Sequence, residues 1–209
     1  ICRDMNLTVS QRERVDAVFR FAQTRLSPGA RKREAEGRFD RELWQEAADF
    51  GLAGLPIPEV WGGSGLDAVD TMLVVEALGK GCEDGGLVFS LCAHMFASAV
   101  PLWRSKATAH HERYLRDIAA GKLICANGTS EPEAGSDVYA MKARARREGG
   151  DYVLEGEKCF ITNAPIADYM IIVAYTDPDA GIDGMGIFVV DTDTDGLTVN
   201  RIEKLGNLS

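Results

Sequence analysis

The hydrophobic pattern changes its period near Gly121, and this change constrains the fold more than any other feature. Before it, apolar residues recur every three or four positions, as on one face of an amphipathic helix. After it, short β-branched and aromatic runs are separated by Gly, Asp and Pro, which is typical of strands and turns. Helices followed by strands indicate an α+β fold, because a parallel βαβ fold would alternate them. We expect an all-α domain over residues 1–121 and a mostly antiparallel β-barrel or β-sandwich domain over 122–209.

Five helices are predicted in the first part, over residues 10–26, 40–51, 67–79, 86–103 and 108–120. Ser10 and Glu13 have the spacing of a capping box, and Asp40 is a predicted N-cap. Residues 55–65 hold two prolines and three glycines, so we expect an irregular loop there. The predicted strands of the second part are 123–127, 152–162, 169–175, 185–191 and 197–202, and 142–155 is predicted to form a hairpin.

Composition limits the classes of partner. Apolar residues make up 45% of the chain and charged residues 26%, which is typical of folded domains. The net charge of -9 repels phosphate backbones and anionic lipids, so we expect neither nucleic-acid binding nor membrane insertion. The apolar residues 85–103 include His94, serines and a proline, and we expect a buried helix there. The N-terminus has no export-signal pattern, so the expected location is cytoplasmic.

Some residues that resemble functional motifs have a simpler structural explanation. The five cysteines are odd in number and form no CxxC pair, so we expect reduced thiols and no metal site. Residues 63–68 match G-x-G-x-x-A, but prolines precede them instead of a parallel strand. His110 and His111 are adjacent on a polar helix and point about 100° apart, which indicates a solvated face. His94 is expected to be a hydrogen-bonded core residue.

Residues 128–140 form the most informative segment, because they connect two predicted strands with small residues and hydroxyls. Such a loop brings backbone N–H groups and short donors close to a flat ligand. A flavin needs donors of this kind, since its N1–C2=O edge gains negative charge on reduction. A plain polar connection between strands explains the composition equally well.

A second segment, residues 158–164, ends a predicted strand with an aromatic residue, Ile and Thr. Because side chains alternate along a strand, Phe160 and Thr162 are predicted to face the same side. An aromatic plane and a hydroxyl on one face suit the isoalloxazine ring of a flavin. The same pair also packs for purely structural reasons on many sheets.

Together these segments resemble the acyl-CoA dehydrogenase family. Residues 128–140 resemble its signature, which runs small, aliphatic, Ser/Thr, Glu, two variable residues, small, Gly, Ser/Thr and Asp. Residues 160–163 resemble its aromatic-Ile-Thr-Asn motif, and the loop at 58–65 is also similar. The resemblance covers essentially the whole chain. It implies FAD as cofactor, a flavin-binding β-domain truncated at its C-terminal end, and the absence of a C-terminal four-helix domain that would follow Ser209.

The resemblance also implies residue roles. Ser130 is placed near the flavin pyrimidine edge, Phe160 beside the ring and Thr162 near N5. Gly135 and Ser136 are placed against the pantetheine arm of a thioester substrate. Two positions depart from the family pattern. Thr129 replaces an aliphatic residue and is expected to change little, because it keeps the shape of Val. Phe160 replaces a common Trp, which puts the redox tuning of the ring and the access to it in doubt. The complete set of predicted cofactor-binding residues is Asn127, Thr129, Ser130, Phe160, Ile161 and Thr162.

The implied reaction is α,β-desaturation of an acyl thioester. A carboxylate removes the α-proton while a hydride leaves the β-carbon for flavin N5. The resemblance places this carboxylate beyond Ser209, so no catalytic residue is assigned, and Glu131 and Glu133 are rejected as substitutes. Implied partners are acyl-CoA or an acyl-carrier thioester, an electron-transfer flavoprotein or similar acceptor, and a homo-oligomer or a second chain. Alternatives are a carrier-protein-specific dehydrogenase, a flavin oxidase or hydroxylase of this fold, and a non-catalytic subunit.

Overall fold

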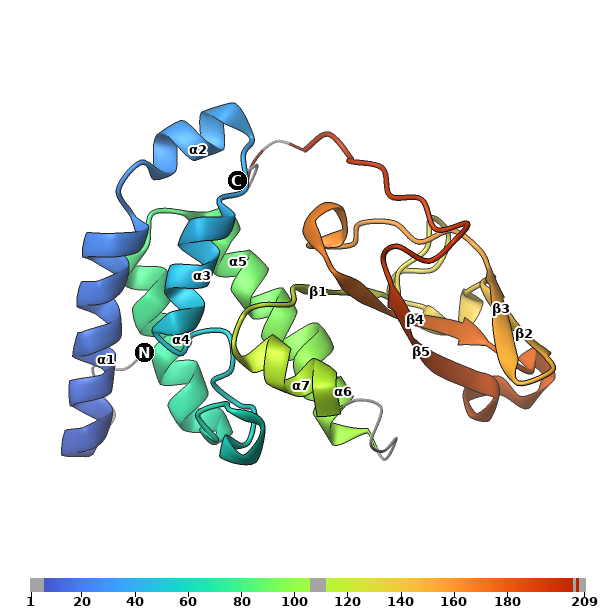
Figure 1. Cartoon of the computed structure of the whole chain (residues 1–209), viewed down its shortest axis with the longest axis horizontal. Coiled ribbons are helices and arrows are strands. Elements are labelled where there is room, and N and C mark those ends of the chain that lie inside the picture. Colours follow the sequence, from blue (N-terminus) through green and yellow to red (C-terminus); the bar gives the residue numbers. More distant parts are fainter. Residues whose placement is uncertain (1–5, 106–111, 205, 207–209) are drawn as a thin grey trace. The chain divides into compact units, whose positions relative to one another are not determined.

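The computed structural model describes residues 6–105, 112–204 and 206. It divides the chain into two compact units (Figure 1). The helical unit comprises residues 1–122 and 203–209, and the β-unit comprises residues 123–202. This division confirms a helical part followed by a sheet-containing part. The predicted helix over residues 108–120 is described only from Glu112 onward, and His110 and His111 lie outside the described residues.

Each of the five predicted helical ranges contains a helix in its described residues, with differences at the helix ends. The capping box of the first helix is made by Thr8 and Gln11 instead of Ser10 and Glu13. Asp40 caps its helix as predicted, accepting from the Leu43 amide at 3.2 Å. The described helices are α1 (Val9–Phe21), η2 (Ala22–Leu26), α2 (Ala30–Glu36), α3 (Arg41–Asp49), η3 (Glu59–Trp61), α4 (Ala68–Gly81), α5 (Gly85–Cys92), η4 (Ala93–Ala99), α6 (Val100–Arg104) and α7 (Glu112–Ala119).

Helix α2 was not predicted from the sequence, and a buried ion pair explains its position. Arg33 of α2 donates to Asp84 at 2.7 Å, and both side chains are almost fully buried. The Arg33 guanidinium also donates to the carbonyls of Leu26 and Pro28, at 2.8 Å each. Asp84 in turn accepts from the Leu87 amide at 3.0 Å and so caps α5. One ion pair therefore fixes α2 and the start of α5.

Helices α5, η4 and α6 follow one another from Gly85 to Arg104. Half of the most apolar stretch within these residues is buried. Among the described residues, this is one segment that is long and apolar enough to cross a membrane, a property that the core helices of soluble proteins share. The predicted buried helix is thus buried on one face, while Phe89 is 54% exposed. His94 is fully buried, 3.3 Å from the Ile118 carbonyl and edge-on to Trp44, which confirms it as a core residue.

The β-unit is built around β4 (Tyr169–Tyr175), which lies parallel to β1 (Cys125–Gly128) and antiparallel to β5 (Met185–Asp191). β2 (Arg144–Glu148) meets the end of β4 in parallel at one residue pair and forms the predicted hairpin with β3 (Asp151–Glu155). The sheet is therefore mixed, with two parallel and two antiparallel pairings in the described part of the chain. Short helices η6 (Val138–Ala140), η7 (Ala164–Ile166) and η8 (Pro178–Gly184) lie in its connections.

Two predicted strands differ from the structure. The strand predicted over 152–162 ends at Glu155, and residues 197–202 form no strand. The chain leaves the sheet at Gly156, where a Cβ atom would lie 2.7 Å from the Ala143 Cβ. A residue with a side chain does not fit so close to a neighbouring backbone. The segment that follows is therefore a turn-rich connection.

Candidate functional site

The β-unit brings the two predicted flavin segments together. We call residues 128–137 the signature loop and residues 158–163 the aromatic turn. The Cys159 amide donates to the Ser130 carbonyl at 3.0 Å. The Lys158 ammonium donates to the Thr129 carbonyl at 3.1 Å and to the Glu131 carboxylate at 2.7 Å. Residues about thirty positions apart thus become direct neighbours.

The aromatic turn has an unusual backbone conformation. Phe160 and Asn163 have φ values of 57° and 71°, and they are the two non-glycine residues with positive φ in the described part of the chain. Left-handed conformations of this kind cost about 1–3 kcal/mol each and concentrate at functional sites. Asn163 is anchored by its side-chain amide, which donates to the Cys125 carbonyl at 3.3 Å.

The Phe160 side chain projects into solvent and is 78% exposed. The expectation that Phe160 and Thr162 face one side of a strand is wrong, because no strand exists at these residues. The turn, with its left-handed residue, sets the direction of the ring instead. An aromatic ring held outward at an energetic cost is available to cover a flat ligand.

Half-buried hydroxyls lie on both segments. Neither the Ser130 nor the Thr162 hydroxyl makes a hydrogen bond to another residue within the described ranges. Thr129, by contrast, donates to the Asn127 side-chain oxygen at 2.5 Å, which gives the hydroxyl of this unusual Thr its partner. These two hydroxyls have no partner among the described residues and can donate hydrogen bonds to the edge of a flavin. The exposed Phe160 ring can cover its planar face.

The two glutamates of the signature loop are both committed to structural contacts. Glu131 is buried and accepts from the amides of Lys142 at 2.6 Å and Ala143 at 3.0 Å, as well as from Lys158. Burial raises the Glu131 pKa, but these hydrogen bonds outweigh it and hold the pKa below its ordinary value. The exposed Glu133 pairs with the Lys142 ammonium, which also lowers its pKa. Neither residue has the raised pKa that favours a general base.

The predicted substrate contacts, Gly135 and Ser136, are exposed residues of the signature loop. No hydrogen bond in the described part of the chain links either residue to the aromatic turn. The loop is held beyond them by Asp137, which accepts from the Tyr139 amide at 3.2 Å. Tyr175 of β4 then donates to the Tyr139 carbonyl at 3.2 Å.

Comparison with known proteins identifies the family of the chain. Residues 8–122 match the family model for the acyl-CoA dehydrogenase N-terminal domain, and residues 126–209 match the model for its middle domain. The chain belongs to the acyl-CoA dehydrogenase family. The chain spans about half the length of the curated relatives that it matches.

Proline or a prolyl group appears in the descriptions of several similar proteins. An L-prolyl-[peptidyl-carrier protein] dehydrogenase of Serratia sp. is 46% identical over 95% of this chain and 52% of its own length. A solved structure described as PigA with FAD and proline is 44% identical with a TM-score of 0.93, covering 98% of this chain and 54% of that one. A prolyl acyl carrier protein oxidase, AnaB, is 37% identical with a TM-score of 0.91, covering 97% and 54%. The presence of FAD in PigA agrees with the predicted cofactor.

Two residues of this candidate site were not assigned from the sequence. Lys158 precedes the aromatic residue by two positions, and a lysine within a mostly apolar motif was the available signal. Asn163 ends the motif, and Asn tolerates left-handed conformations better than most residues. Both residues hold the aromatic turn in place, since Lys158 binds the signature loop and Asn163 binds β1.

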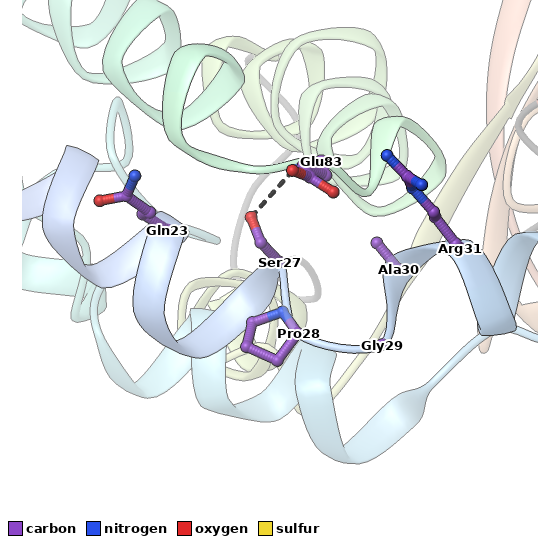
Figure 2. A pocket seen from close by; sticks show the side chains of 7 residues that line it. All are labelled: Gln23, Ser27, Pro28, Gly29, Ala30, Arg31 and Glu83. Carbon is purple, nitrogen blue, oxygen red and sulfur yellow. Dashed lines mark hydrogen bonds between the residues drawn. The ribbon is translucent and has the colours of Figure 1, made fainter.

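A hollow in the helical unit lies apart from these residues in sequence. It has a volume of about 360 Å³. Figure 2 shows the side chains that line it, namely Gln23, Ser27, Pro28, Gly29, Ala30, Arg31 and Glu83. The Ser27 hydroxyl is committed there, because it accepts from the Glu83 amide at 2.9 Å and donates to the Gly81 carbonyl at 2.8 Å. The lining includes no predicted site residue.

The cysteines and the other possible metal ligands of the described residues form no metal site. Among the described residues, no group of three or more His, Cys, Asp or Glu side chains could hold a metal ion. The four described cysteines are free thiols, namely Cys82, Cys92, Cys125 and Cys159. Burial raises the pKa of Cys82 and Cys92 and so disfavours their thiolates.

Proposed function

We propose that this chain forms the flavin-contacting part of an FAD-dependent dehydrogenase that desaturates an acyl thioester. The observation that carries this proposal is the pairing of the signature loop with the aromatic turn. That pairing leaves the hydroxyls of Ser130 and Thr162 uncommitted and the Phe160 ring outward. Membership of the acyl-CoA dehydrogenase family and the FAD in PigA support the choice of cofactor.

Each residue then has a physical role. The Ser130 hydroxyl donates to the pyrimidine edge, where negative charge develops on reduction. The Thr162 hydroxyl donates near N5, and the Phe160 ring covers one face. When bound, FAD supplies the acceptor for the hydride that leaves the β-carbon. Asn127, Thr129 and Ile161 shape the surrounding backbone, because Asn127 and Thr129 bind each other and the Ile161 carbonyl accepts from Ala164 at 3.2 Å.

We further propose that the acyl group is an amino acid, such as proline, held on a carrier protein. The support is the similarity to the Serratia enzyme and to AnaB, whose descriptions both name carrier-bound prolyl substrates. Acyl-CoA is the second candidate, favoured by the family as a whole. Both substrates present a pantetheine arm, for which Gly135 and Ser136 are the proposed contacts. An electron-transfer flavoprotein as acceptor, a homo-oligomeric state and a cytoplasmic location stay predictions.

Anaerobic flavin bleaching separates these substrates. The complete protein that contains this chain should purify with a flavin absorption spectrum, and prolyl-carrier thioester should bleach it faster than butyryl-CoA. Faster bleaching by butyryl-CoA would favour the second candidate. A colourless protein that FAD does not reconstitute would contradict both and favour a non-catalytic subunit.

A further inference from the structure

Lys158 and Glu131 form an ion pair whose burial sets it apart within the β-unit. Their side chains are 10% and 6% exposed. The other ion pairs described within the β-unit, Lys142 with Glu133 and Arg146 with Glu148, have more than half of each side chain exposed. Exposed pairs of that kind contribute little to stability, whereas a buried pair loses solvation on both charges. The burial of this one pair therefore calls for a specific reason.

The contacts of the pair join the two segments that carry the proposed flavin donors. Glu131 is fixed to the start of β2 through the amides of Lys142 and Ala143. Lys158 reaches from the aromatic turn to Glu131 and to the Thr129 carbonyl. The Cys159–Ser130 backbone hydrogen bond, at 3.0 Å, joins the same two segments. The pair thus links the aromatic turn to the two residues that lead into β2.

The aromatic turn needs such a bridge because its backbone is strained. Phe160 lies two residues after Lys158 and has a φ of 57°. A strained turn persists only where surrounding contacts over-determine it. Lys158 on one side and Asn163 on the other supply side-chain contacts that hold the turn against the signature loop and β1.

We propose that Lys158 and Glu131 are positioning residues for the flavin. By joining the aromatic turn to the signature loop, they fix the separation of the Ser130 and Thr162 hydroxyls before the cofactor arrives. A preorganised site binds more tightly because less ordering accompanies binding. This inference rests on the proposed function, since it presumes that FAD is the ligand of these hydroxyls.

The test measures the dissociation constant of FAD from the complete protein. FAD is added to the apo form, and binding is followed by the quenching of flavin fluorescence. Lys158→Met removes the ammonium at similar length, and binding should weaken at least tenfold. Lys158→Arg keeps the charge and the donors and should recover most of the affinity. Lys142→Met is the matched control, because it removes the same charge from the exposed pair with Glu133. Its dissociation constant should change less than twofold.

Two further measurements separate positioning from general loosening. In Lys158→Met the visible circular dichroism of bound FAD should change, and in the apoprotein the Cys159 amide should exchange hydrogen faster. Distant amides of β4 should keep their protection. If Lys158→Met does not fold, Lys158→Gln carries the same expectations, since it keeps a donor without the charge.

Different results would overturn the proposed function and the inference about Lys158 and Glu131. Wild-type protein that binds no FAD would overturn the proposed function. Wild-type protein that binds FAD while Lys158→Met binds it equally well, with an unchanged spectrum, would overturn this inference alone. Equal weakening by Lys142→Met would also overturn it, because charge rather than position would then be responsible.

Discussion

At the scale of single residues, Phe160 shows how the site uses conformational strain. Its left-handed backbone conformation is unfavourable for a residue with a Cβ atom and would not be for glycine. The position nevertheless carries a large and exposed aromatic ring. The sequence revealed the identity of this residue but not its geometry, because a strand was predicted there. The prediction that Phe160 and Thr162 share one face rested on the alternation of side chains along a strand, and no strand exists at these residues.

Replacing Phe160 separates the strain from the ring. Phe160→Gly and Phe160→Ala both remove the aromatic surface, but only glycine relieves the left-handed backbone. We expect the glycine variant to be more stable than the alanine variant by about 1 kcal/mol, measured by urea unfolding. Both should bind FAD more weakly than wild type. Equal stability of the two variants would show that position 160 is not left-handed in solution.

Thr162 tests the hydroxyl donor. Thr162→Ala should weaken FAD binding or slow flavin reduction by the thioester about tenfold, because a hydrogen bond to a group that gains charge is lost. Thr162→Ser keeps the hydroxyl and should stay close to wild type. Stopped-flow absorbance and FAD titration give the two quantities. If Thr162→Ala has the FAD affinity and the flavin reduction rate of wild type, then Thr162 is not part of the site.

At the scale of elements, the sequence predicted those whose hydrophobic pattern is self-contained. β4 and β5 begin and end where their apolar runs do, at Tyr169–Tyr175 and Met185–Asp191. Helix α2 has no apolar stripe and depends on the distant partner of Arg33, so no local pattern could reveal it. Gly156, which follows the strand end at Glu155, lies close to Ala143, and no local pattern could reveal this tertiary approach either.

The dependence of α2 on its ion pair is measurable. Arg33→Met leaves Asp84 buried without its cation, and breaking such a pair costs about 3 kcal/mol or more. We expect the unfolding midpoint of the helical unit to fall accordingly in urea. Lys32→Met, next to it, breaks only the exposed pair with Glu36 and should cost less than about 0.5 kcal/mol. Similar losses in both variants would contradict the account of α2.

At the scale of the whole molecule, lowered carboxylate pKa values predict loss of stability in acid. Hydrogen bonds from Gln11 and Arg14 lower the pKa of Asp70, and those around Glu131 outweigh its burial. A carboxylate with a lowered folded-state pKa stabilises the protein fully above its ordinary value, here 3.8 for Asp70 and 4.5 for Glu131. The contribution is lost as the pH falls through the folded-state pKa.

We therefore expect the free energy of unfolding to decrease steadily below about pH 4.5, the ordinary pKa of Glu131. Urea unfolding between roughly pH 3 and pH 7, a range that includes the ordinary pKa values of both carboxylates, measures how the free energy of unfolding changes with pH. Glu131→Gln should be less stable at neutral pH and should show a shallower acid dependence. An unchanged slope in that variant would mean that Glu131 does not titrate as its contacts require.

The family and the two-part fold could be predicted because two short motifs occur in the right order in a chain with one change of period. The contacts of Lys158 and Asn163 could not, because they join residues that are 27 and 38 positions apart. A crystal structure of the complete protein with FAD tests the central claim most directly. It should place the Ser130 and Thr162 hydroxyls about 3 Å from the flavin edge, with Phe160 beside the ring. A flavin bound elsewhere, or hydroxyls turned away from it, would contradict the account.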